Sequence, residues 1–274
     1  MRIQAIEANT AELLLRMGTA GGGVRRNDAK AQWTIGGSPL DYHNAVVAAD
    51  LSAEEADEVI AESLALMKAQ GVPGTWHVGP SMRPGDLRER LVAGGFAYDG
   101  REPAMAVEIG KLSRAELGPP ELEIARVSTD EEMAVWEETL GRGFGEGPPE
   151  AAWVAEIFRR EGYDDPWRHY LARLDGKPVA TATIFLTEDV AGVYFVMTVP
   201  EARRKGIGGA ITQYAVRAAG EAESLPAAGE AESPRAGRSA ARYAVLGASS
   251  AGQPVYERLG FVALGGIELY AFHW

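Results

Sequence analysis

The feature that most constrains this chain is a basic, glycine-rich run, VPEARRKGIGG at 199–209, between an expected strand and an expected helix. The preceding stretch, AGVYFVMTV at 191–199, has the β-branched and aromatic composition of a buried strand. Apolar side chains then recur at helical spacing, at Ile207, Ala210, Ile211, Tyr214, Ala215 and Ala218. A strand that leads directly into a helix predicts a mixed α/β fold with the basic run at the junction.

This junction has the chemistry of an anion site. The first backbone amides of a helix have no partner within the helix, and the helix dipole places positive potential there. Glycines at 206, 208 and 209 let an oxygen-bearing group approach the backbone, and Arg203, Arg204 and Lys205 add positive charge. The run suits a pyrophosphate, although it matches neither a Walker A loop nor a GxGxxG dinucleotide motif. A basic surface turn capped by glycines is the simpler alternative.

Composition excludes several classes of protein. The net charge of −12 argues against broad binding of nucleic acid, so any anion site is local. The chain has no cysteine, which removes disulfides, thiolate metal sites and cysteine nucleophiles. The four histidines lack ligand spacing, so we expect no metal site. With no signal-peptide pattern and no long apolar run, we expect a cytoplasmic protein that does not contact membranes.

The 274 residues divide at a proline- and glycine-containing stretch, SRAELGPPE at 113–121, which we interpret as a linker between domains at 1–112 and 122–274. Both segments mix α and β patterns. A duplicated sequence, AAGEAESLP followed by AAGEAESPR, is too polar to form a core, so we expect a solvated insertion at 218–240.

Two motifs in the second segment resemble those of the GCN5-related N-acetyltransferases, the GNAT superfamily. The stretch VYFVMTVPEARRKGIGGAITQYAVRAA is similar to motif A, with Arg203, Gly206 and Gly208 in the R/Q-x-x-G-x-G/A pattern. ASSAGQPVYERLGFV is similar to motif B. The resemblance covers roughly 122–274 and implies a GNAT fold, with the duplicated insertion between the two motifs.

The resemblance also implies acetyl-CoA as co-substrate and assigns residues to it. Backbone groups of 196–199 would pair with the pantetheine like an added strand, and amides of 204–209 would hold the pyrophosphate. The expected cofactor-binding residues are Val196, Met197, Thr198, Val199, Arg203, Arg204, Lys205, Gly206, Ile207, Gly208 and Gly209. Ser249 and Ser250 lie near a polar position of the family, but a helix-cap serine explains them equally well.

Tyr256 matches the position at which many family members carry a tyrosine as general acid, which would protonate the departing CoA thiolate. The alternative role for Tyr256 is packing beneath the final strand. No general base is identifiable from the sequence. Glu188 and Asp189 are the nearest acidic candidates before motif A, but their pattern is more typical of a solvated turn.

The acceptor site of this fold is usually shaped by the first two helices, so the aromatic residues of 136–167 are candidates to line it. They are Trp136, Phe144, Trp153, Tyr163 and Trp167, interspersed with Arg142, Glu146, Asp164 and Asp165. Aromatics beside carboxylates suit a cationic or amphipathic amine. Ordinary packing of two helices accounts for the same pattern equally well.

The first segment resembles a degenerate copy of the second. NAVVAADLSAEEADEVIAESLALMKAQG at 44–71 follows the strand–junction–helix order of motif A, and RPGDLRERLVAGGF echoes motif B. Its junction carries Asp50, Glu54, Glu55 and Asp57 in place of cations and glycines. Carboxylates there would repel a pyrophosphate, so we expect a smaller GNAT-like domain that binds no acetyl-CoA. An unrelated α/β extension is the alternative.

These observations favour an acetyltransferase that moves acetyl from acetyl-CoA to a primary amine of a small molecule by direct attack in a ternary complex. Two other functions stay open: a non-catalytic module that senses acyl-CoA, and an acetyltransferase for protein N-termini or lysines. The sequence names neither the acceptor nor the oligomeric state, monomer or homodimer.

Overall fold

A computed structural model describes residues 1–221 and 240–273 of the chain. Most of the duplicated segment, which we expect to be a solvated insertion, falls outside the described residues. Within them, eleven strands form one mixed sheet in the order β1-β2-β3-β4-β11-β5-β10-β9-β8-β7-β6. The mixed α/β class expected from the sequence is therefore confirmed.

The strands of the first segment are β1 (Val24–Asn27), β2 (Ala31–Ile35), β3 (Ala45–Ala49), β4 (Gly74–Val78) and β5 (Ala97–Glu108). Those of the second are β6 (Leu122–Val127), β7 (Trp167–Leu174), β8 (Lys177–Thr187), β9 (Val190–Thr198), β10 (Tyr243–Gly247) and β11 (Val262–Phe272). The α-helices are α1 (Ile3–Ala20), α2 (Ala53–Gln70), α3 (Leu87–Ala93), α4 (Asp130–Gly141), α5 (Pro148–Glu161), α6 (Ile207–Ala219) and α7 (Gln253–Leu259). Short 3₁₀ turns are η1 (Asp41–His43), η2 (Ile109–Lys111) and η3 (Pro200–Ala202).

Local sequence signals explain several of these boundaries. Ser52 and Glu55 form a complete capping box at the start of α2. The Thr129 side chain accepts a hydrogen bond from the Glu132 amide at the start of α4. Asp175 and Gly176 both have positive φ, 50° and 74°, as a tight turn between β7 and β8 requires.

The two segments repeat one arrangement. In each, a pair of parallel strands is joined by a helix, β3–α2–β4 in the first and β9–α6–β10 in the second. A short helix and a long strand follow, α3 and β5 in the first, α7 and β11 in the second. This repeat agrees with the internal similarity that the sequence indicates.

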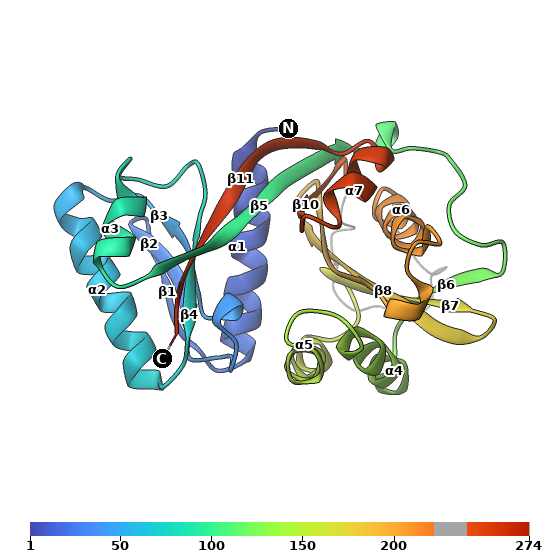
Figure 1. The fold of residues 1–274 in the computed structure, drawn as a ribbon, viewed down its shortest axis with the longest axis horizontal. Helices are drawn as coiled ribbons and strands as arrows, with labels where there is room; N and C mark the ends of the chain where they lie inside the picture. The colour runs from blue at the N-terminus through green and yellow to red at the C-terminus, as the bar shows by residue number, and fades with distance from the viewer. Residues whose placement is uncertain (222–239, 274) are drawn as a thin grey trace, which may run out of the picture.

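The last strand of each segment crosses to the other (Figure 1). β11 pairs with β4 through Glu268–Phe272 and also runs antiparallel to β5. β5 in turn pairs with β10 through Ala104–Glu108. The final strand of the second segment thus lies between two strands of the first, an exchange that the sequence pattern does not indicate.

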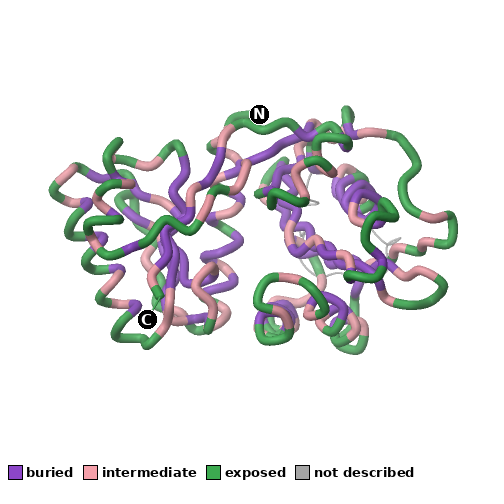
Figure 2. The backbone as a smooth tube through the Cα atoms, in the orientation of Figure 1, coloured by how far each residue is buried: buried purple, intermediate pink, exposed green. Residues whose placement is uncertain are grey.

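Helices cover both faces of the second half of the sheet, with α4 and α5 on one face and α6 and α7 on the other (Figure 1). The long helix α1 lies between the two halves, in contact with β9 and α5. Buried residues follow the strands and the inward faces of the helices, whereas 113–121 is largely exposed (Figure 2). None of the described helices has the length and apolar character that crossing a bilayer requires.

Candidate active site

Strands β9 and β10 separate part-way along their length. They pair in parallel only through Val190–Gly192 and Tyr243–Val245 in the described structure, while β9 continues to Thr198. The pairing of β9 with β8 has a register shift opposite Thr181–Thr183, which distorts β9. Phe195 adopts a positive φ of 51° at this point. The Phe195 carbonyl accepts a hydrogen bond from Thr181 Oγ1 at 2.9 Å. The separation leaves a wedge beside Val196–Thr198, where we expect the pantetheine.

The basic-glycine run forms the turn that connects β9 to α6. Arg204 and Gly206 both adopt left-handed backbone conformations, with φ of 64° and 78°. The first hydrogen bond of α6 runs from the Ala210 amide to the Gly206 carbonyl, and no described side chain caps the helix. The amides of Ile207, Gly208 and Gly209 are therefore left to an external acceptor.

Arg203 has contacts of its own in this turn. Its Nε donates to the carbonyl of Thr198 at 3.0 Å, and its Nη2 donates to the carbonyl of Gly143 at 3.4 Å. The side chain thus joins the end of β9 to the loop between α4 and α5. Arg204 and Lys205 are exposed at the helix start, where their charges face solvent.

The corresponding junction of the first segment is already filled. The Ser52 hydroxyl and the Glu55 carboxylate occupy backbone donors at the start of α2. The Arg83 amide donates to the Ala49 carbonyl at 3.0 Å, and Arg83 forms a parallel bridge with Asp50. The chain's own backbone therefore pairs with the end of β3, the position that corresponds to the wedge beside β9.

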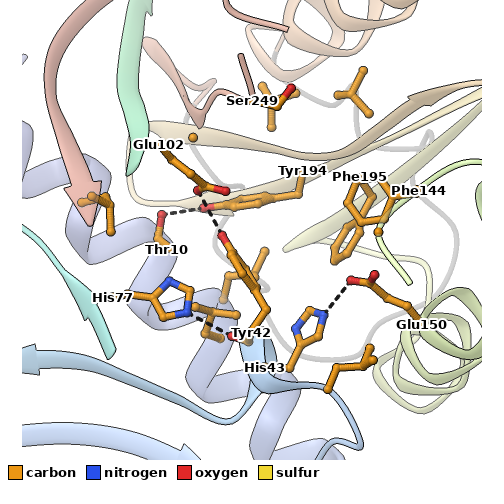
Figure 3. A pocket seen from close by; sticks show the side chains of 18 of the residues that line it. Thr10, Tyr42, His43, His77, Glu102, Phe144, Glu150, Tyr194, Phe195 and Ser249 are labelled. Atoms are coloured by element: carbon orange, nitrogen blue, oxygen red, sulfur yellow. Dashed lines mark hydrogen bonds and ion pairs between the residues drawn. The ribbon is translucent and has the colours of Figure 1, made fainter. Parts of the chain in front are cut away.

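A cavity of about 330 Å³ lies between the two halves and reaches the wedge (Figure 3). The first segment contributes Ile6, Thr10, Leu13, Leu14, Leu40, Asp41, Tyr42, His43, His77, Glu102 and Ala104 to its lining. The second contributes Phe144, Gly145, Glu146, Glu150, Val193, Tyr194, Phe195, Val196, Gly247, Ser249, Tyr256 and Ile267. Such a volume suits a small molecule and is enclosed by both segments.

The charged residues of the lining are acidic. Asp41, Glu102, Glu146 and Glu150 line the cavity, and no lysine or arginine does so among the described residues. Aromatic rings from Tyr42, Phe144, Tyr194, Phe195 and Tyr256 surround these carboxylates. Carboxylates and aromatic faces together favour a cationic ligand.

Glu102, on β5, lies at the end of the cavity that also holds Ser249 (Figure 3). Tyr42 Oη donates to Glu102 Oε2 at 3.3 Å, and His77 Nε2 donates to the Tyr42 carbonyl at 3.0 Å. Burial raises the pKa of Glu102, although the Tyr42 hydrogen bond opposes the shift. Burial also lowers the pKa of His77 to about 4, so this histidine is neutral at physiological pH.

His43 and Glu150 form a second polar pair on another side of the cavity (Figure 3). His43 Nε2 lies 3.2 Å from Glu150 Oε1, and the imidazole packs against the Trp153 ring at 4.6 Å between centroids. Burial alone would raise the pKa of Glu150, but hydrogen bonds from His43 and the Glu146 amide lower it below its usual range. Glu150 is therefore held ionised.

Tyr256, on α7, is half-buried and lines the cavity. Burial raises its pKa to about 12, so the phenol is protonated at physiological pH. Ser249 lines the same cavity and also accepts a hydrogen bond from the Gly252 amide at 3.1 Å. Ser250 is exposed and outside the lining.

The aromatic residues proposed from the sequence for the acceptor site lie in different places in the structure. Trp136 and Trp167 are fully buried in the core, so the packing alternative is correct for them. Tyr163 hydrogen-bonds to Asp130, and Trp153 donates to the Gly37 carbonyl, both outside the cavity lining. Phe144 and Glu146 do line it, whereas Arg142, Asp164 and Asp165 do not.

Glu188 and Asp189, the acidic candidates for a base, are exposed in the turn between β8 and β9 and do not line the cavity. Their interpretation as a solvated turn fits this placement. Tyr42, His43, His77 and Glu102 come from the first segment and were not predicted from the sequence. A signal existed for two of them, because His77 and Glu102 are polar residues within or beside otherwise apolar strand sequences.

Comparison with protein families finds a match in the second half of the chain. The family described as "Acetyltransferase (GNAT) domain" matches residues 165–263, a range that includes the wedge, the basic-glycine turn and Tyr256. Residues 165–263 are therefore similar to a GNAT domain. No curated protein matches the sequence of the chain.

Solved structures extend the GNAT likeness to the whole fold. A GCN5-related N-acetyltransferase from Kribbella flavida is 20% identical with a TM-score of 0.66, and the match covers 98% of this chain and 96% of that one. A tandem GNAT protein from the clavulanic acid biosynthesis pathway is 10% identical with a TM-score of 0.58, over 99% and 96% of the two chains. A conserved protein from Staphylococcus epidermidis, described as functionally unknown, is 17% identical with a TM-score of 0.64, over 91% and 93%. A layout of two GNAT-like domains fits these likenesses.

Proposed function

We propose that this protein transfers the acetyl group of acetyl-CoA to a primary amine of a small molecule held in the cavity between its two halves. One observation carries the proposal: the cavity is lined both by Val196, at the wedge of the GNAT domain, and by Tyr256. An acceptor in the cavity would therefore meet the acyl end of a cofactor that runs along β9. The acidic and aromatic lining supports a cationic acceptor.

The GNAT domain would hold the cofactor in two places. Backbone groups of Val196–Val199 would pair with the pantetheine, as an added strand does. The amides of Ile207, Gly208 and Gly209 would hold the pyrophosphate at the start of α6, with Arg204 and Lys205 adding charge and Arg203 fixing the turn. We propose that the segment at 1–112 binds no cofactor, since its own backbone and capping box fill the equivalent places.

The acetyl group would pass directly from CoA to the acceptor amine, without an acetylated enzyme. The acceptor nitrogen attacks the thioester carbonyl, the C–S bond breaks as the tetrahedral intermediate collapses, and Tyr256 gives its phenolic proton to the CoA thiolate. The neutral state of the phenol suits this role. The nitrogen gives up the proton that restores Tyr256, so amide and CoA thiol leave together from one ternary complex.

Transfer of the acetyl group can be followed with a thiol-reactive dye that detects released CoA. Because the chain has no cysteine, the protein itself gives no background signal in this assay. Acetyl-CoA should raise the melting temperature, and a panel of amines should then be screened for CoA release, with mono- and diamines beside lysine-containing peptides. Turnover of a small amine, with intersecting initial-rate lines and no acetylated enzyme by mass spectrometry, supports the proposal. Binding without turnover of any amine contradicts it and favours an acyl-CoA sensor. Preference for the peptides favours a protein acetyltransferase instead.

A further inference from the structure

We propose that Glu102, contributed by the first segment, is the general base that removes the proton from the acceptor's ammonium group. The inference rests on the proposed function and deepens it. It assigns a catalytic residue to the segment that lacks a cofactor site, and it specifies that the acceptor binds as a protonated primary amine.

Glu102 lies against the end of β10 that faces the wedge. β5 pairs with β10 through Ala104 and Gly247, at the end of β10 that faces the wedge. A methyl group added at Gly247 would lie 2.7 Å from Glu102 Oε2, so the carboxylate rests directly against this strand end. Ser249 and Tyr256 line the same cavity. Glu102 therefore lies where the acyl group of a cofactor in the wedge would arrive.

The other carboxylates of the lining are less suited to take a proton. Glu150 is held ionised by His43 and the Glu146 amide, which lower its pKa and occupy its oxygens. Glu146 is exposed. Asp41 accepts a hydrogen bond from the Tyr42 amide and lies 3.7 Å from the His273 imidazole. Among these groups, Glu102 combines burial, a raised pKa and a position beside β10.

The surroundings of Glu102 contain no described cation that would hold it ionised. Figure 3 shows Tyr42 of η1, Tyr194 of β9 and the uncharged Thr10 of α1 beside it, and His77 of β4 and Tyr256 of α7 line the same cavity. The pKa values of the three tyrosines are raised by burial and that of His77 is lowered, so all four groups are neutral near pH 7. A cationic amine is thus the natural partner of the Glu102 carboxylate.

The acceptor nitrogen loses two protons during acetyl transfer, and each has a defined acceptor. Glu102 takes one proton from R–NH₃⁺, which frees the nitrogen lone pair for attack on the thioester. The second proton leaves the nitrogen as the C–S bond breaks and restores Tyr256 after the phenol protonates the thiolate. Glu102 then releases its proton to solvent, so each turnover yields amide, CoA thiol and one proton.

The test compares Glu102→Gln with Glu188→Gln, a matched change at the exposed turn between β8 and β9. Gln keeps an oxygen that can accept the Tyr42 hydrogen bond, so the fold should be preserved. With an amine found in the CoA-release screen, E102Q should lower kcat about 100-fold or more and leave the acetyl-CoA Kd unchanged. E188Q should leave both values unchanged.

The pH profile separates a base from a residue that only binds the amine. A base must be ionised, so wild-type kcat should rise with pH through the raised pKa of Glu102, and E102Q should lack this rise. Because the amine binds in its protonated form, kcat/KM should also fall as pH rises through the pKa of the free amine. Two amines of different pKa should therefore be compared; the Glu102 limb stays in place and the substrate limb moves. Tyr42→Phe removes a hydrogen bond that stabilises the carboxylate, so it should move the Glu102 limb to higher pH.

A ¹³C NMR titration of the Glu carboxyl carbons, with E102Q for assignment, gives a readout that does not depend on turnover. A carboxyl that titrates above the ordinary glutamate range and disappears in E102Q supports the inference. Wild-type turnover together with an E102Q variant that retains kcat and the same pH limb overturns it and leaves the proposed function standing. A wild-type protein that releases CoA with no amine overturns both.

Discussion

Burial acts on single side chains of this cavity by favouring their neutral forms. The phenol of Tyr256 is protonated because its pKa is raised to about 12, while the raised pKa of Glu102 makes its carboxylate a stronger base than an exposed glutamate. An acid and a base with separated pKa values in one cavity are what proton transfer near neutral pH requires. Desolvation thus prepares both residues for the roles that we propose.

At the residue scale we predict that Tyr256→Phe lowers kcat about 100-fold or more while acetyl-CoA still binds, because the variant loses the proton donor but keeps the ring. Steady-state rates and calorimetry of acetyl-CoA binding check this expectation. Tyr214→Phe is the matched control, since Tyr214 is exposed on α6 and its ring packs against Tyr170. A Y256F variant with wild-type kcat would remove Tyr256 from the mechanism.

The starts of two helices, α2 and α6, differ in how their first backbone amides are satisfied. α6 begins at Ile207, directly after the N-cap residue Gly206, with its first amides uncapped among the described residues and with cations before it. α2 begins with a capping box of Ser52 and Glu55, which satisfies the donors internally and adds negative charge. The strand–helix junction before α6 therefore favours an anion, and the one before α2 disfavours it.

At the element scale we predict that Arg204→Ala with Lys205→Ala weakens acetyl-CoA binding about tenfold to a hundredfold, because two charge-assisted contacts to phosphate are lost. The salt dependence of the Kd should also become shallower, since fewer cations face the phosphates. Calorimetry over a series of salt concentrations measures both effects.

The control for this pair is Arg173→Ala with Lys177→Ala, which removes the same charge from the hairpin between β7 and β8. This variant should bind acetyl-CoA as the wild type does. Equal weakening by both double variants would mean that net charge, and not the turn before α6, determines affinity.

The exchange of β5 and β11 joins the two segments into one sheet. β11 contacts β4 and β5 of the first segment, and β5 contacts β10 of the second. Separating the segments would expose the edges of β4 and β10 and open the cavity between the halves. The linker at 113–121 lies along α6, where Gln213 Nε2 donates to the carbonyls of Ser113 and Ala115 and Arg217 Nη2 donates to that of Ser113.

At the scale of the whole molecule we predict that cutting the linker leaves the halves together. A protease site inserted at 115–117 should yield two fragments that co-elute in size-exclusion chromatography and unfold in one transition. Residues 122–274 expressed alone should aggregate, because β10 loses its β5 partner and β11 loses β4. Fragments that separate without denaturant, or a soluble and folded 122–274, would show that the strand exchange contributes little to stability.

Sequence alone determined the local elements and the motif chemistry. Caps, turn glycines and apolar periodicity act over a few residues, which is why the strand–turn–helix around Gly206 could be predicted. The α2 capping box and the Asp175–Gly176 turn follow from their local sequence in the same way. The same locality led to the GNAT resemblance, since its motifs lie on continuous stretches. The weak internal repeat was also visible, because each copy keeps its own order of elements.

Only the tertiary structure decided which residues surround the cavity. Tyr42 and Glu102 meet Tyr194 and Tyr256 because β5 and β11 cross between the halves and α1 fills the space beside β9. Long-range pairing of this kind leaves no periodicity in the sequence, and burial, which sets the pKa of Glu102 and Tyr256, depends on the final packing. Trp136 and Trp167 illustrate the converse, because whether an aromatic residue faces a cavity or the core is settled only when the helices meet the sheet.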